Sequence, residues 1–335
     1  MEKNISASAD SPDSEITLHF NLGALRIALS SNSPLVGRYA REFLDEWLEP
    51  EAASPPDMQI HLDLSVSLPL FIEHEPIFVN NEQYLPDGVG TLFVFEQPKG
   101  FLFYFQDGAL VSVKPESRLI EGHITTRLLH YGRLHDLLFT SLSPFLRRRG
   151  YYLIHAAAAV REGKAAVFTG PPGCGKSTTV LNLVLNGWQF VSNDTLLLQE
   201  RPDGIYALPT PGGFSVRPES VSHLPALAAH LPQQQPDQFY HLSPHKLGVK
   251  WANPARISTI YFPEISEGKE NDLLPLPPAV TMARLIELSL DRWDTADLSA
   301  HISFIERLSR QAQGTSLRIA DQQKLPNILN NAMRH

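Results

Sequence analysis

The chain has almost no cysteine and no long apolar run. Cys174 is the one cysteine among 335 residues, so no disulfide can form within the chain and a reducing compartment is expected. No apolar run approaches the roughly 20 residues that a membrane-spanning helix needs. The first residues are polar and acidic, without the charged and then apolar pattern of a secretory signal. These absences predict a cytoplasmic location and no membrane partner.

Basic residues are also scarce. The chain has 28 Lys and Arg against 36 Asp and Glu, which gives a formal net charge of −8. Its longest basic run is Arg147-Arg148-Arg149. A protein that binds along nucleic acid needs a basic face to neutralise the phosphates. Nucleic acid is therefore not expected as a main partner, although a local basic patch stays open.

The composition predicts a globular protein with two domains. The chain is 43% hydrophobic and 19% charged, which is ordinary for a globular protein, and its length exceeds what one core typically holds. Residues 1–15 are rich in Ser, Asp, Glu and Asn, so a disordered tail is expected there. Residues 16–146 are expected to form a β-rich α+β domain for recognition or regulation, and residues 150–335 an α/β domain.

Hydrophobic periodicity places the elements of both domains. Alternation predicts strands at 16–29 with a turn at Gly23, at 58–68 and in pieces across 91–113, and helical spacing predicts helices at 35–48 and 124–146. In the second domain, 256–262 is predicted as a strand, 281–290 and 298–311 as helices, and the proline-rich stretches 224–236 and 274–278 as loops.

A phosphate-binding motif opens the second domain. After the apolar run 165–169 the chain reads Gly170-Pro171-Pro172-Gly173-Cys174-Gly175-Lys176-Ser177, which matches G-x-x-x-x-G-K-[ST] without exception. Glycines allow a tight turn whose N–H groups face phosphate oxygens. The helix that follows adds the partial positive charge of its N-terminus. We therefore expect these residues, with Thr178, to bind ATP as a P-loop.

Residues in and after the loop are candidates for phosphate and metal binding. Lys176 is expected to reach the β- and γ-phosphates, and Ser177 to ligate Mg²⁺. A short helix is followed by an apolar strand that ends in Asn193 and Asp194. Asp194 would stand beside Ser177 at the carboxyl end of this strand and hold the metal directly or through water. The alternative for Asp194 is a turn or capping residue. Cys174 lies where backbone amides can lower the pKa of its thiol, although phosphoryl transfer needs no thiol.

Residues 151–218 resemble the HPr kinase/phosphorylase group of P-loop proteins, which includes HPr-kinase-related proteins and the kinases of lasso-peptide precursors. The segments that carry the resemblance are His155-Ala156-Ala157-Ala158, the P-loop, the run from Asn186 to Asp194, and the run from Phe214 to Pro218. A strand with an acidic end so soon after the P-loop helix is typical of this group and of phosphoenolpyruvate carboxykinases. The resemblance implies an α/β P-loop domain of the HPr kinase/PEP carboxykinase type, preceded by the β-rich α+β domain.

One departure from the family's pattern lies at Asn193. In the family two consecutive acidic residues end this strand, the first implicated in activating the acceptor hydroxyl and the second in holding the metal. Asp194 matches the second, but Asn193 replaces the first and cannot accept a proton as a carboxylate can. Three readings stay open. Transfer can depend on positioning more than on a strong base, another residue such as His155 can serve as the base, or the protein binds nucleotide without transferring phosphate.

Two more residues match positions of the family. His155 is at the upstream histidine position, and its alternative is a packed residue at the start of a buried strand. Arg217 is at the basic position where a guanidinium could neutralise the transferring phosphate, and its alternative is a surface arginine before Pro218.

The sequence therefore predicts an ATP- and Mg²⁺-dependent kinase that phosphorylates a hydroxyl, with a serine of a peptide or protein as the first candidate acceptor. The candidate catalytic residues are His155, Lys176, Asn193, Asp194 and Arg217. The acceptor-binding signature of true HPr kinases is not found, so HPr itself is not the expected acceptor. A nucleotide-binding regulatory or scaffold protein and a small-molecule kinase are the alternatives. The oligomeric state is not indicated.

Overall fold

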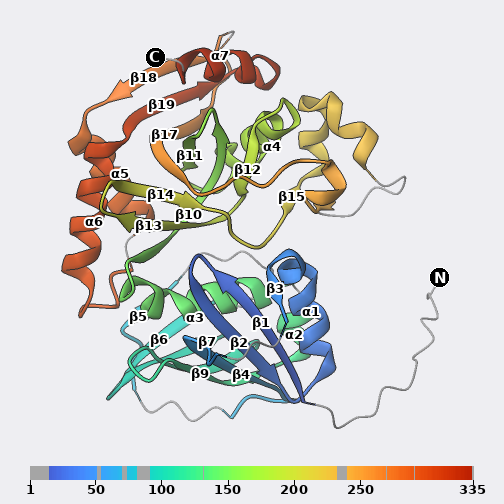
Figure 1. Cartoon of the computed structure of the whole chain (residues 1–335), viewed down its shortest axis with the longest axis vertical. Coiled ribbons are helices and arrows are strands. Elements are labelled where there is room, and N and C mark those ends of the chain that lie inside the picture. Colours follow the sequence, from blue (N-terminus) through green and yellow to red (C-terminus); the bar gives the residue numbers. More distant parts are fainter. Residues whose placement is uncertain are drawn as a thin grey trace. The chain divides into compact units, whose positions relative to one another are not determined.

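A computed structural model describes most of the chain. The described residues are 15–50, 54–69, 74–80, 91–130, 132–231, 240–268, 270–289 and 291–333. The chain divides into two units, Met1–Leu142 and Ser143–His335, and each is described by itself (Figure 1). The expected disordered tail, residues 1–15, lies outside the described residues apart from Glu15. Within the described ranges no helix is long and apolar enough to cross a bilayer.

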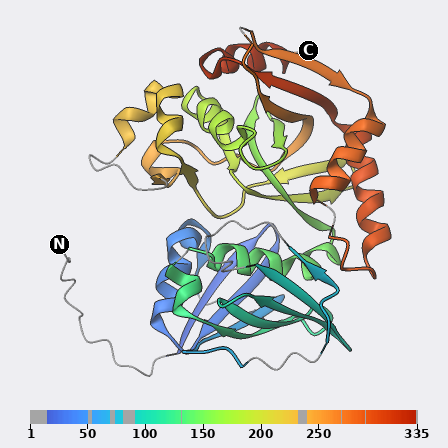
Figure 2. The same ribbon diagram turned by 180° about the vertical axis from the view of Figure 1, so that it is seen from behind.

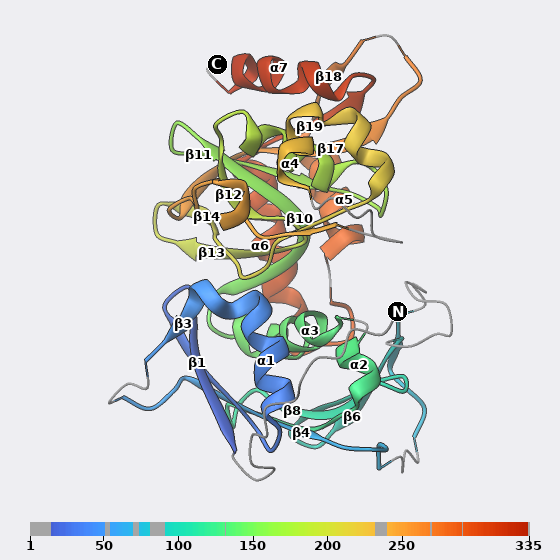
Figure 3. The ribbon, with the colours of Figure 1, turned by 90° about the vertical axis from the view of Figure 1, so that its right-hand side faces the viewer.

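The described part of the first unit is a nine-stranded sheet with helices packed on it (Figure 3). Its strands are β1 (Ile16–Leu22), β2 (Leu25–Ser31), β3 (Leu48–Glu49), β4 (Met58–Leu64), β5 (Phe78–Val79), β6 (Leu92–Gln97), β7 (Gly100–Phe105), β8 (Ala109–Lys114) and β9 (Leu119–Ile124). Its helices are α1 (Pro34–Leu44), the 3-10 helix η1 (Asp45–Trp47), α2 (Thr126–His130) and the larger part of α3 (Leu134–Arg147). The strand order is β3-β1-β2-β4-β9-β8-β7-β6-β5, with β4 parallel to both β2 and β9.

Period-two alternation explains the strands of this unit. Along β1 the side chains of Leu18, Phe20 and Leu22 are buried while their neighbours face outward, as a half-buried strand requires. Gly23 adopts a left-handed φ of 62° at the turn into β2, so the predicted hairpin is confirmed. The single helix expected over 124–146 is wrong, because Ile124 ends β9 and the helical residues that follow belong to two elements, α2 and α3.

The second unit combines strands with helices that lie on both faces of its main sheet. Its strands are β10 (Tyr151–Arg161), β11 (Lys164–Thr169), β12 (Gln189–Ser192), β13 (Thr195–Arg201), β14 (Gly204–Leu208), β15 (Phe214–Val216), β16 (Tyr240–Leu242), β17 (Ala255–Ile265), β18 (Asp272–Leu276) and β19 (Gln313–Ile319). Its helices are α4 (Lys176–Leu185), α5 (Pro278–Ser289), α6 (Leu298–Gln311) and α7 (Leu325–Ala332), with 3-10 helices η2 (Pro218–His223), η3 (Pro225–His230), η4 (His245–Leu247) and η5 (Gln322–Lys324).

The main sheet of the second unit is mixed and curls back on itself. Its order is β11-β10-β13-β14-β17-β19-β18, and β12 also pairs with β10. Strand β17 pairs in parallel with both β11 and β19, and antiparallel with β14. The stretch 274–278, expected as a loop, is instead the end of β18 and the start of α5. Proline is tolerated there because Pro275 sits on an edge strand, where a missing N–H costs no ladder bond.

Two apolar clusters lie on the two faces of this sheet. Residues of α4 and α7 pack with Phe168 and Phe190 in one cluster, and residues of α5 and α6 pack with Val167 and Val191 in the other. Figures 1 and 2 show α4 and α6 on opposite faces. Both units are thus mixed α and β structures built on large sheets.

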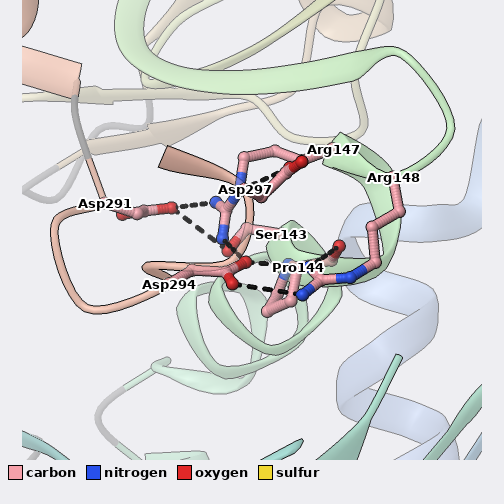
Figure 4. Close-up of polar contacts among 7 residues, drawn as sticks. All are labelled: Ser143, Pro144, Arg147, Arg148, Asp291, Asp294 and Asp297. Carbon is pink, nitrogen blue, oxygen red and sulfur yellow. Dashed lines mark hydrogen bonds and ion pairs between the residues drawn. The ribbon is translucent and has the colours of Figure 1, made fainter. Parts of the chain in front are cut away.

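A buried ionic cluster fixes the segment between α5 and α6 (Figure 4). The Arg147 guanidinium, 4% exposed, pairs with Asp291, with Asp294 at 2.6 Å and with Asp297 at 3.6 Å. Arg148 adds a 2.8 Å ion pair to Asp294. Burial disfavours the ionised carboxylate, but hydrogen bonds from the two arginines hold the pKa of Asp294 below its usual value. The cluster lies wholly within the second unit, at the last turn of α3.

His301 of α6 is buried beside this cluster. It is 2% exposed, its ring lies 5.3 Å from that of Tyr152, and its Nε2 has no hydrogen-bond partner among the described residues. Burial, followed by the nearby positive charge of Arg147, lowers the pKa of His301 from 6.5 to about 4, and Asp294 opposes this shift only weakly. The imidazole is therefore neutral in the folded protein at neutral pH.

We predict that His301 makes the second unit less stable in mild acid. Because its folded pKa lies below its unfolded pKa, the unfolded chain binds more protons between pH 6.5 and 4, and stability falls as the pH is lowered through that window. Between pH 7 and pH 5 the loss from this one group is about 2 kcal/mol. Urea unfolding at both pH values should show a smaller pH dependence in His301→Phe than in the wild type. The exposed His230→Phe serves as the matched control, and an unchanged pH dependence in His301→Phe would contradict the prediction.

Candidate functional site

The loop 170–175 joins the end of β11 to the start of α4. Strand β11 is buried from Ala165 to Thr169, and α4 buries Val180, Leu181, Leu183 and Val184. Three glycines of the loop have positive φ: 157° at Gly170, 81° at Gly173 and 100° at Gly175. A side chain at any of them would strain the backbone. The sequence pattern of strand, glycine-rich turn and helix is therefore realised between residues 164 and 185.

The first turn of α4 is open to an anion. Its N-cap residue is Gly175, which offers no side-chain hydrogen bond to the amides of that turn. Free N–H groups and the helix dipole together favour a negatively charged ligand at this position. A Cβ added at Gly175 would lie 3.0 Å from the side chain of Ile265 and 3.5 Å from that of Ile319. The ends of β17 and β19 thus border the loop.

Lys176 is held inside the loop. Its side chain is 6% exposed, and Nζ donates to the carbonyl oxygens of Gly170 at 2.7 Å and Pro171 at 3.2 Å. An ammonium group has three donors, so one remains for a ligand. The next two residues, Ser177 and Thr178, are half-buried, and their hydroxyl groups make no hydrogen bond within the described part of the chain. These groups are available to a ligand at the helix start.

The pairing of β10 brings the Asn193–Asp194 turn to the level of the loop. Ala156 of β10 lies opposite Thr169, the last residue of β11, on one edge. On its other edge, the Ala156 N–H donates to the Asp194 carbonyl at 2.9 Å. Neighbouring strands are about 4.8 Å apart, so the backbones at Thr169 and Asp194 are separated by about 10 Å. Both lie where β11 and β12 end, which is also where the loop begins.

His155 and Asp194 form a pair near these strand ends. The distance from His155 Nδ1 to Asp194 Oδ1 is 3.1 Å, and the side chains are 43% and 53% exposed. Thr169 Oγ1 donates to the His155 carbonyl at 3.0 Å, which ties the pair to the end of β11. Asp194 Oδ2 makes no hydrogen bond with the described residues, and His155 Nε2 likewise stays available. The structure thus places two of the predicted residues in direct contact.

Asn193 is enclosed beside this pair. Its side chain is 9% exposed, and its Oδ1 is buried with no hydrogen-bond partner among the described residues. Leaving a buried acceptor unpaired costs about 1–3 kcal/mol. A water molecule or a ligand that donates a hydrogen bond to Oδ1 would remove this cost.

Side chains that the sequence did not indicate hold this turn. Ser192 Oγ and Thr210 Oγ1 both donate to the Thr195 carbonyl, at 2.7 Å and 2.6 Å, and the Thr210 N–H donates to the Val191 carbonyl. A buried Gln322 of η5 lies behind the loop, where its Nε2 donates to Thr179 Oγ1 at 3.4 Å. The turn could have been found from the hydroxyl residues beside it, since Ser192 ends β12 and Thr195 begins β13. Nothing near Gln322 in the sequence points to the loop.

Arg217 is on the side of the sheet that α4 covers. It directly follows β15, whose Phe214 and Val216 belong to the apolar cluster of α4. Its side chain is exposed, and it occupies the N-cap position of η2. Its predicted role in charge neutralisation stays a prediction.

The expectation of a lowered pKa for Cys174 is wrong. Burial raises the pKa of this thiol, and the opposing effects of the Lys176 charge and of backbone hydrogen bonds are smaller. The sulfur packs toward the backbone of Gly170, where an added Cβ would lie 3.1 Å from Sγ. Cys174 is therefore a packing residue of the loop.

Two oxygen atoms of the predicted site have chemistry that suits Mg²⁺. Ser177 Oγ and Asp194 Oδ2 are hard oxygen donors without hydrogen bonds to the described chain, and Mg²⁺ is usually bound by one or two protein oxygens together with substrate phosphates and water. Among the described residues, no group of three or more His, Cys, Asp or Glu side chains could hold a metal by itself. The residues present fit a metal that is shared with a phosphate ligand.

Comparison with known proteins identifies no family for the chain. No model of a protein family matches the chain, and no curated protein matches it. Among solved structures the chain is similar to the Hpr(Ser) kinase/phosphatase from Coxiella burnetii, at 12% identity and a TM-score of 0.28, over 54% of this chain and 93% of that one. A likeness at this level does not define a family for the chain.

We predict slow alkylation of Cys174 in the folded protein. Its raised pKa leaves less thiolate at pH 7.5, and burial limits access, so iodoacetamide should react at least about tenfold more slowly than with the urea-unfolded chain. Mass spectrometry gives an unambiguous rate because the chain has one cysteine. A folded-state rate equal to the unfolded one would show an accessible, reactive thiol instead.

Proposed function

We propose that the protein is an ATP- and Mg²⁺-dependent kinase that transfers phosphate to a hydroxyl group. The observation that carries the proposal is the loop 170–175 with its left-handed glycines, its uncapped helix start and the buried Lys176 ammonium. Each feature favours a polyphosphate ligand. The motif resemblance of residues 151–218 to HPr-kinase-type P-loop proteins is the second support.

The residues of the proposed site would have distinct parts in binding. The backbone N–H groups of residues 173–178 would surround the β- and γ-phosphates, and Lys176 would donate its remaining hydrogen to them. Ser177 and Asp194 would hold Mg²⁺, which when bound neutralises phosphate charge. Arg217 would approach the same phosphates from the side of α4. The lysine, the helix start and the metal ligands thus meet the negative charge from different directions.

The His155–Asp194 pair would act on the acceptor. Asp194 accepts at His155 Nδ1 and so fixes the ring with Nε2 facing outward, as an oriented general base requires. In the transfer step the acceptor hydroxyl oxygen forms a bond to the γ-phosphorus. The bond from that phosphorus to the β,γ-bridging oxygen breaks, ADP leaves, and the hydroxyl proton moves to His155 Nε2. Asn193 needs no basicity in this scheme.

The acceptor proposed first is a serine of a peptide or protein, because the resembling kinases include those of lasso-peptide precursors. A small molecule with a hydroxyl group is the second candidate. The competing proposal is a regulatory or scaffold protein that binds nucleotide without transfer, favoured by the amide at position 193 in place of a carboxylate. A cytoplasmic location follows as part of the kinase proposal, since ATP and reduced Cys174 are both found there.

We predict that Lys176→Ala weakens MgATP binding. Losing a hydrogen bond to a charged phosphate costs about 1.5–3 kcal/mol, which is about a tenfold to hundredfold rise in Kd. Calorimetry with purified protein measures this directly. Lys164→Ala is the matched control, since Lys164 begins the same strand, β11, at its opposite end. Equal affinities for both variants would overturn nucleotide binding at this loop.

We predict that His155→Gln slows transfer strongly while sparing binding. Removing a general base lowers kcat by about a hundredfold or more, and the Kd for MgATP should stay within about twofold. Transfer of labelled γ-phosphate to components of a lysate of the source organism is the readout, with the exposed His230→Gln as the control. Tight ATP binding by the wild type without any labelled product would reject the kinase and favour the scaffold proposal.

A further inference from the structure

The two polar atoms of the Asn193 amide face different surroundings. Oδ1 is enclosed and unpartnered, whereas Nδ2 is not among the enclosed atoms of the described chain and makes no hydrogen bond within it. The residue as a whole is 9% exposed, so a small part of it reaches solvent. The amide nitrogen is therefore the polar atom that a ligand can reach.

Strand pairing places the backbone of Asn193 near the start of the loop. The residue stands between Ser192, which pairs with Ala158 of β10, and Asp194, whose carbonyl accepts from the Ala156 N–H. Ala156 in turn pairs with Thr169 at the end of β11. Asn193 is thus one strand away from the residue that leads into the phosphate loop.

The chemistry of an amide nitrogen decides which ligand fits. Nδ2 has two hydrogens to donate and no lone pair to accept with. It can contact a phosphoryl oxygen, but it cannot ligate a metal or take a proton from a hydroxyl. A neutral donor also adds no negative charge beside a triphosphate, whereas a carboxylate at the same place would repel it. An asparagine at position 193 therefore supplies a hydrogen-bond donor where a carboxylate would supply a base.

We propose that Asn193 is a hydrogen-bond donor to the γ-phosphoryl group, and that its amide stabilises the oxygens of that group as they take up charge during transfer. This inference rests on the proposed nucleotide site and assigns a role within it. The donor acts together with Lys176, and proton removal is left to His155. Preorganised donors of this kind act most strongly where a side chain is fixed by burial, as Asn193 is.

The test compares triphosphate with diphosphate. The Kd values of MgATP and MgADP are measured by calorimetry for the full chain as wild type, Asn193→Asp, Asn193→Ala and Asn253→Asp. Asn253 is an exposed residue before β17 and makes no hydrogen bond within the described chain, so it controls for the added charge. Thermal unfolding of each variant checks that the fold is kept.

A donor to the γ-phosphate predicts a loss that is specific to the triphosphate. Asn193→Asp should weaken MgATP by about tenfold or more, and Asn193→Ala by less, while MgADP stays within about twofold for both. Where transfer is measurable, kcat should fall about a hundredfold in Asn193→Asp. Asn253→Asp should match the wild type in each measurement.

Two results would overturn the inference while leaving nucleotide binding intact. Faster transfer by Asn193→Asp would make position 193 the site of a lost base, and tighter Mg²⁺-dependent binding would make it a metal position. Equal losses for MgATP and MgADP would also reject a contact with the γ-phosphate. If the wild type binds neither nucleotide and Lys176→Ala changes nothing, the proposed function itself fails and this inference with it.

Discussion

The candidate site depends on strand β10, because both of its edges are paired. β11 lies along one edge, and β12 and β13 follow one another along the other. The interruption between β12 and β13 is the Asn193–Asp194 turn, and it falls beside Ala156, directly across from Thr169. Ladder hydrogen bonds thus set the separation between the loop and the acidic residue. Such a distance changes little when side chains move, as a positioned reaction needs.

Small buried residues make β10 suitable for this central place. The four alanines from Ala156 to Ala159 are fully buried, alternate ones facing the clusters of α4 and of α6. Because an alanine takes little space, helices approach the sheet closely on both faces. The polar groups of the site lie at the ends of the strands beside β10. Away from these strand ends, Arg147 and its aspartates hold the α5–α6 segment by charge within a largely apolar unit. A rigid apolar body with polar groups at one edge is a common basis for a functional site.

Much of the fold was predictable where the signal is local. The alternation along β1 and β2 and the turn at Gly23 gave the hairpin, and the helices α5 and α6 follow from their apolar spacing. Predictions failed where pairing with a distant strand overrides local preference. Residues 274–276, part of an expected loop, end β18 beside β19, and Ile124, expected to begin a helix, ends β9 between β4 and β8.

For the site itself, the sequence alone determined the strand, the turn and the helix around Lys176, because the positive φ of the glycines and the start of a helix are properties of a few consecutive residues. Only the tertiary structure decided the contact of His155 with Asp194, the enclosure of the Asn193 oxygen and the raised pKa of Cys174. These depend on strand register and on exclusion of water, and both arise from residues far apart in the chain.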